Sequence, residues 1–186
     1  MPLRVEAYAV DAIARGQVDW PGRFRDGLEA AVDLPVHDAT LVPLDDPRPQ
    51  SVGSITIGID DLVIGVADDD PAAPVHAAWH RIRLECGPYV VEGELSTMPG
   101  FDPGRALTRP TGTFVLLRDV VVRLLGRPEA GESPHDHALV NRYAVDSVEA
   151  DIMLGFFFPG ARIIGDPAAP GALPPPGLES GHAAAR

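Results

Sequence analysis

The chain has 186 residues, an apolar fraction of 45% and a formal net charge of −12 at pH 7. This length fits one domain or two small ones, and the apolar content is normal for a globular protein. The negative charge argues against binding to nucleic acid or to an anionic membrane, because both carry charge of the same sign. All 15 basic residues are Arg, which we interpret as the composition of a high-GC bacterial genome.

The cysteine content and the apolar runs limit the compartment. Cys86 is the single cysteine, so no intrachain disulfide can form, and its strand-like surroundings predict a buried side chain. No apolar run approaches the ~20 residues of a transmembrane helix. The first residues lack the pattern of a secretory signal peptide. We therefore expect a cytoplasmic protein without a membrane span.

In the first half, apolar residues with strand and helix spacing predict five strands and one short helix. The strands are expected at 3–10, 13–18, 34–44, 55–59 and 62–66. The helix is expected at 23–32, where Phe24 and Leu28 have amphipathic spacing. The proline-containing stretch 45–53 is expected to form a loop.

A linker is expected over 68–80, because the stretch 68–74 is acidic and contains prolines. A short helical turn is expected at the end of this linker, and the second half follows it. The apolar run 114–125 is either one buried strand or two short strands joined at Arg118–Asp119. A loop is expected at 126–136. The other expected strand regions are 81–86, 89–95 and 137–149.

Several features recur in the same order, roughly 80 residues apart. Gly16 and Gly93 both interrupt apolar strands, and Asp38 and Asp119 both lie between apolar strand segments, where each is expected to cap a tight turn. A period of this length predicts a duplicated small domain, with chance likeness of two β-rich halves as the alternative. The predicted fold class is mainly β (β or α+β), with two tandem small bent sheets or barrels, each with a short helix.

These boundaries predict two small β domains, a linker, an apolar segment and a disordered tail. In chain order they cover 1–67, 68–80, 81–150, 151–164 and 165–186. The apolar segment contains Phe156, Phe157 and Phe158, and is too short to span a bilayer. It either packs on the core or docks on a partner, because an exposed cluster of this kind marks an interface.

Candidate catalytic and metal-binding residues are few. His76 and His80 have the spacing of a helical zinc pair but lack the glutamate of that motif, and His135 and His137 flank an aspartate in the expected loop. We found no nucleophile elbow, no phosphate-binding glycine loop and no paired cysteines. We therefore assign no catalytic residue, no metal site and no cofactor from the sequence.

The pattern of strands, a glycine in a bent strand and the closing residues Val140-Asn141-Arg142 resembles a small bacterial β domain of unknown function. The likeness covers 81–149 well and 5–66 loosely; Ala106-Leu107-Thr108-Arg109 departs from it, and it implies no activity. Gly16 and Gly93 also give the chain a likeness to Sm-like small barrels, which bind RNA in rings. The acidic charge and the absence of a basic, aromatic-studded face argue against RNA.

Three functions are compatible with these observations. The first is a non-enzymatic structural or protein-interaction module that self-associates or docks a partner through Phe156, Phe157 and Phe158 or through exposed strand edges. The second is a ligand-binding or sensing domain, with a pocket between the halves lined by Trp79, Arg105 and Arg109. The third is a metal-dependent enzyme that uses the four histidines named above.

Overall fold

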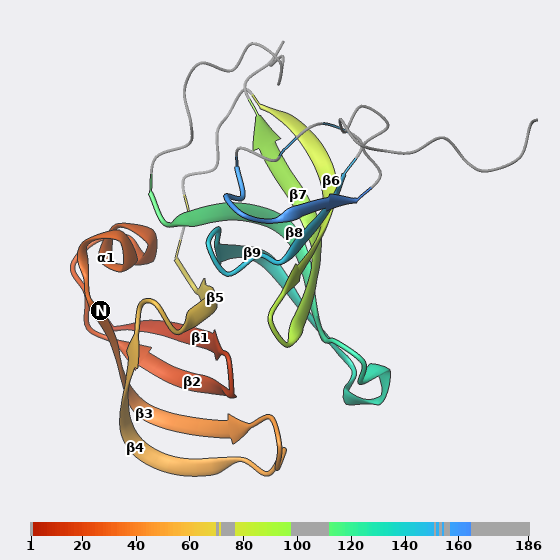
Figure 1. Ribbon diagram of the computed structural model, residues 1–186. Helices are drawn as coiled ribbons and strands as arrows, with labels where there is room; N and C mark the ends of the chain where they lie inside the picture. The colour runs from red at the N-terminus through yellow and green to blue at the C-terminus, as the bar shows by residue number, and fades with distance from the viewer. Residues whose placement is uncertain are drawn as a thin grey trace, which may run out of the picture.

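The computed structural model describes residues 2–69, 71, 77–97, 112–150, 152, 154 and 157–164. Within this part of the chain, eleven strands form one sheet, with a short helix α1 and a 3-10 turn η2, so the predicted mainly β class is confirmed (Figure 1). The elements are β1 Leu3–Ala9, β2 Ala12–Val18, α1 Phe24–Ala30, β3 Asp33–Pro43, β4 Gln50–Gly58, β5 Leu62–Ala67, β6 Ala78–Cys86, β7 Tyr89–Thr97, β8 Phe114–Leu124, η2 Pro128–Ala130, β9 Glu132–Asn141, β10 Ser147–Ala150 and β11 Arg162–Ile164.

The two halves of the chain use the same strand order. The sheet runs β11-β10-β6-β7-β8-β9-β5-β1-β2-β3-β4. The first half is therefore arranged 5-1-2-3-4 and the second 10-6-7-8-9, which is the same pattern. They join where β5 pairs antiparallel with β9, through Ile64 opposite Val140 and Gly65 opposite Leu139.

Of the two expected forms, bent sheets or barrels, a closed barrel does not form among the described strands. The sheet has two ends, β11 and β4, and the strand ladder does not close. The physical reason is that β5 and β9 satisfy each other's edge hydrogen bonds across the halves, so neither half has to close on itself. The matching strand order does not by itself show a tandem duplication, which stays a prediction.

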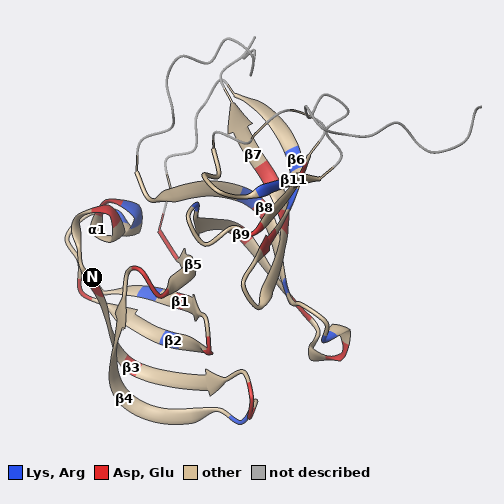
Figure 2. Ribbon diagram, viewed as in Figure 1, with Lys and Arg blue, Asp and Glu red and all other residues tan. Residues whose placement is uncertain are grey.

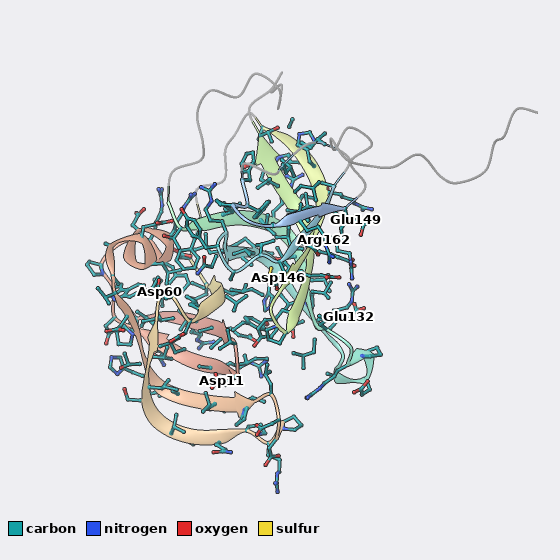
Figure 3. All side chains as sticks on the ribbon, viewed as in Figure 1. Asp11, Asp60, Glu132, Asp146, Glu149 and Arg162 are labelled. Atoms are coloured by element: carbon teal, nitrogen blue, oxygen red, sulfur yellow. The ribbon has the colours of Figure 1, made fainter. Side chains whose placement is uncertain are left out.

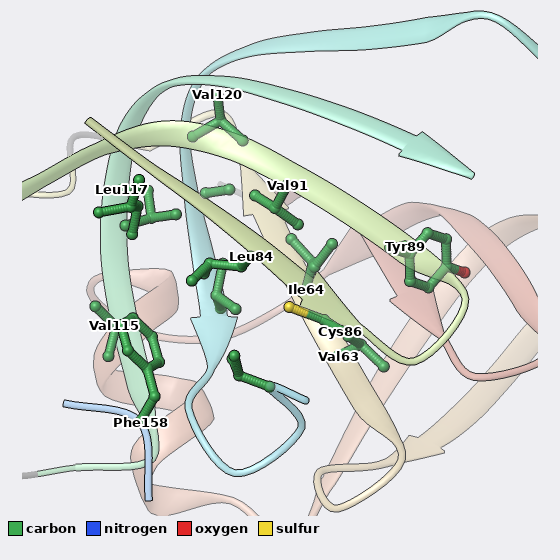
Figure 4. Packing of buried hydrophobic residues seen from close by; sticks show 14 of the residues in the cluster. Val63, Ile64, Leu84, Cys86, Tyr89, Val91, Val115, Leu117, Val120 and Phe158 are labelled. Carbon is green, nitrogen blue, oxygen red and sulfur yellow. The ribbon is translucent and has the colours of Figure 1, made fainter. Parts of the chain in front are cut away.

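Two hydrophobic clusters fill the two halves, and each includes side chains from the other. The cluster of the second half takes in Tyr8, Val63 and Ile64, while the cluster of the first half takes in Phe114 and Leu139. Figure 4 shows Val63 and Ile64 of β5 beside side chains from the second half. Because each cluster contains side chains from both halves, burial of apolar area couples the folding of the two halves.

Two stretches expected to be loops are partly strand. β4 begins at Gln50 and β9 at Glu132, so the ends of the expected loops 45–53 and 126–136 belong to the sheet. Pro134 is tolerated because this part of β9 pairs with β8 but not with β5. Pairing with a long neighbouring strand overrides the local turn signals here.

The expected linker is partly structured. β6 begins at Ala78, so a strand replaces the end of the expected helical turn. Asp68 accepts a hydrogen bond from the Arg4 amide at 2.8 Å, which ties the start of this stretch to the first half. The run 114–125 forms one strand, β8, rather than two.

The short helix expected in the second half, at 105–107, and the expected disordered tail lie outside the described residues. No helix in the described part of the chain has the length and apolar character needed to cross a membrane.

Candidate functional site

Each half is bent at a glycine that lies beside a left-handed aspartate. The pairing register shifts in β2 at Gly16 and in β7 at Gly93. On the neighbouring strands, Asp38 and Asp119 have φ angles of 48° and 50°. Aspartate is among the few residues that tolerate this conformation. Both aspartates lie inside continuous strands, β3 and β8, so the prediction that they cap tight turns is wrong.

A cleft of about 890 Å³ lies on the bent face of the first half, where this half meets β9. Its walls come from β1, β2, β3, β5 and the beginning of β9, so both halves contribute. The ionisable lining residues are Arg4, Glu6, Arg15, Asp38, Asp68, Asp69, His135, Asp136 and His137. Five carboxylates against two guanidinium groups make this cleft negative, which favours a cationic or zwitterionic ligand over an anionic one.

Asp69 connects the first cleft to the helix. One of its carboxylate oxygens accepts the backbone N–H of Phe24, the first residue of α1, at 2.7 Å. The other oxygen lies 3.9 Å from Nε2 of His137. This Nε2 is buried and has no hydrogen-bond partner among the described residues.

Hydrogen bonds join the two halves, and one of them involves His135 of the first cleft. The Tyr8 hydroxyl and Nε2 of His135 are 2.8 Å apart, and the Tyr89 hydroxyl donates to the Ala9 carbonyl at 2.6 Å. Burial lowers the pKa of His135 and raises the pKa of Tyr8, the latter with help from Glu6. Both partners of the first bond are therefore neutral at pH 7, and the cleft wall carries no charge at this point.

A second cleft of about 850 Å³ occupies the corresponding place in the second half. Its walls come from β6, β7, β8, β10 and β11. Arg83 lies 3.9 Å from Glu92 and 3.6 Å from Glu149 across this cleft. Where the first cleft has the two histidines of β9, the second has Ile164 of β11. The two clefts thus share a framework but differ in chemistry.

Of the pocket residues expected from the sequence, Trp79 is the one that lies in the described part of the chain. Trp79 lies on β6 with the Arg118 guanidinium 3.7 Å from the centre of its ring, and it lines neither cleft. Arg105 and Arg109 lie outside the described residues. The residues that line the two clefts come from bent strands, and their order in the sequence gives no signal that they converge.

The described part of the Phe segment packs on the core. Phe158 and Leu154 are fully buried in the cluster of the second half, and Phe157 is partly buried against it. Phe156 lies outside the described residues. Phe158 therefore has no surface to offer a partner.

The histidines are distributed over separate contacts. His80 shares a hydrogen bond of 2.9 Å with Thr97, His135 contacts Tyr8 as described above, and His76 lies outside the described residues. The described part of the chain contains no group of three or more side chains arranged to hold a metal ion. His135 and His137 lie in a strand and not in the expected loop.

The end strand β4 is a further candidate surface. It pairs with β3 on one side, and no strand among the described residues pairs with its other side. Its sequence, QSVGSITIG, contains no charged residue, and Figure 2 shows its ribbon without acidic or basic positions. An uncharged open edge is a template for pairing with another strand.

Comparisons with protein-family models, with curated proteins and with solved structures found no match. The likeness to a small bacterial β domain and to Sm-like barrels therefore stays a prediction.

Proposed function

We propose that this chain is a non-enzymatic interaction module that binds an extended protein segment by strand addition at β4. The observation that carries the proposal is the open, uncharged edge of β4 in a chain of net charge −12. Strand addition draws its affinity from backbone hydrogen bonds, which β4 offers along nine residues. We place the binding surface at β4 rather than at the Phe segment because Phe158 is fully buried.

The pairing of β9 with β5 inside the chain supports this mode of binding. β9 occupies in the second half the place that β4 occupies in the first, and β9 pairs antiparallel with β5. The same kind of edge is therefore already used once inside the chain.

A photo-crosslinking amino acid at Ser54, an exposed position of β4, tests the proposal in cells. We expect adducts at Ser54 that disappear when Thr56→Lys is added, because a charge on an edge strand opposes strand addition. The matched control carries the crosslinker at Tyr143, which is 64% exposed and lies outside the strands. Identical adducts from both positions, or adducts that Thr56→Lys leaves unchanged, would contradict the proposal.

Small-molecule binding in the first cleft is a second candidate, favoured by the contribution of both halves to its walls. The excess of carboxylates predicts a cationic or zwitterionic ligand. A thermal-shift screen that pairs polyamines and basic amino acids with anionic metabolites measures this preference. A stabilising cationic compound should lose its effect in Asp136→Asn, which removes an exposed cleft carboxylate. Stabilisation by anions alone would contradict it.

A further inference from the structure

The pairing of β9 with β5 inside the chain shows which part of the corresponding strand β4 is suited to pairing. His37 and Arg118 each precede a left-handed aspartate, and they lie opposite Ser54 and His137 respectively. Counting along both strands, Leu139 and Val140, which pair with β5, correspond to Thr56 and Ile57. Thr56 is exposed and Ile57 is buried, so at this place the edge is open while its inner face is anchored.

The other end of the sheet is closed by the chain itself. Ala7 and Leu84 occupy equivalent places, two residues after the residue opposite the bend glycine. Gly65 of β5 lies opposite Ala7 and Val148 of β10 lies opposite Leu84, so β10 corresponds to β5. β11 runs parallel to β10 and covers this place, with Arg162 opposite Ser147 and Ile163 opposite Val148. Figure 3 labels Arg162 and, on the neighbouring strand, Glu149. The edge that could receive a second copy's β4 in a head-to-tail chain is therefore occupied.

From Ser54 to Gly58, β4 lacks the features that keep strand edges from pairing. Charged residues, prolines, bulges and very short strands serve this purpose in many sheets. The irregularities of β4 lie at its beginning, whereas the stretch from Ser54 to Gly58 pairs with β3 in an unbroken register. β11, by contrast, is three residues long and contains Arg162. One end of the sheet is thus guarded and the other is not.

From these observations we infer that two copies of this chain pair β4 against β4, antiparallel, around a two-fold axis near Thr56. This inference rests on the proposed function and names its partner as a second copy. Among the described strands, β4 is the end strand without such protection and the short β11 covers the other end. Growth therefore stops at two copies, because only an isologous contact is left. The absence of charge on β4 suits self-pairing, since strands that carry like charges in facing positions repel each other.

The test is light scattering after size exclusion on the full chain over a range of concentrations. The wild type should have the mass of a dimer. Thr56→Lys places two like charges near the two-fold axis and should raise the dimer dissociation constant at least about tenfold. The matched control Leu125→Lys adds the same charge at a turn residue that is 48% exposed and should leave the dimer unchanged. A wild type that is monomeric at every concentration, or a Thr56→Lys variant that dimerises normally, would overturn the inference.

Arg162→Pro tests the role of β11 separately. It removes the N–H that Arg162 donates to the Asp146 carbonyl at 2.9 Å, so the covered edge should open and species larger than dimers should form. Circular dichroism establishes that the variant is folded, and a folded variant that stays a dimer would refute the capping role. If the wild type is a monomer but the crosslinker at Ser54 captures another protein in a manner sensitive to Thr56→Lys, self-pairing is wrong and the interaction module stands. A monomer with no such adduct contradicts both.

Discussion

Replacing the two bend glycines by alanine separates their roles, because the space around them differs. A Cβ at Gly16 would overlap the His37 carbonyl oxygen and lie 2.6 Å from Cγ1 of Val36. A Cβ at Gly93 would lie 3.1 Å from the Arg118 carbonyl oxygen and 3.2 Å from a methyl carbon of Val120. The nearest atom is a backbone oxygen at both glycines, but the contact at Gly16 is too close for any real Cβ, while the contacts at Gly93 require a shift of a few tenths of an ångström.

The expected magnitudes follow from this difference. Overpacking costs about 1–3 kcal/mol, and loss of conformational freedom in the unfolded chain returns roughly 0.4–1 kcal/mol when glycine becomes alanine. Gly16→Ala should therefore destabilise the fold by about 1–3 kcal/mol, at the upper end because backbone must move. Gly93→Ala should change the stability by less than about 1 kcal/mol, since the two effects nearly cancel.

Urea denaturation followed by tryptophan fluorescence measures both variants, at one protein concentration because self-association would shift the midpoint. In thermal unfolding, each kcal/mol corresponds to roughly 2–4 °C for a chain of this size. If Gly93→Ala costs as much as Gly16→Ala, close backbone approach is not what requires glycine at these bends, and the reasoning is refuted.

Three further predictions concern the buried groups. Tyr89→Phe should cost about 1–2 kcal/mol in urea denaturation, because it leaves the buried Ala9 carbonyl without its 2.6 Å hydrogen bond; an unchanged midpoint would mean that water replaces the hydroxyl. Burial raises the pKa of the Cys86 thiol to about 12, so iodoacetamide should label Cys86 only after unfolding, and rapid labelling of the native chain would contradict the packing. Burial lowers the pKa of His135, so its contribution to stability is complete above its unfolded-state pKa of about 6.5 and is lost as the pH falls through the lower folded-state pKa. His135→Gln should flatten the decline in stability between about pH 7 and pH 5 that the wild type shows, and equal slopes would rule this contribution out.

The strand pattern was accessible to sequence reasoning because alternation is a local property. The apolar positions of β1 and the bend glycines can be recognised in the sequence, since side chains of a strand alternate every two residues and a close approach of two backbones needs a small residue. The polar beginning of β9 was missed because the sequence around His135 and His137 is typical of a loop, and the sequence does not show that this stretch pairs with β8. Pairing with β8 supplies their backbone partners.

The lining of the first cleft was not predictable from the sequence. The spacing of Gly16 and Gly93 pointed to two similar halves, but the residues that line this cleft come from five strands that meet only after folding. Trp79 was a reasonable aromatic candidate, yet it stacks on Arg118 elsewhere on the sheet.

The sequence by itself determined where most of the strands lie, where glycines bend them and that Cys86 is buried, because each depends on neighbours in the chain. Only the tertiary structure decided that β5 joins β9, that β11 covers β10 and that no described strand pairs with the outer edge of β4. The physical reason is that edge pairing uses the backbone N–H and C=O groups that nearly every residue carries. Side-chain identity therefore says which strands exist, whereas their placement in space decides which edges find a partner.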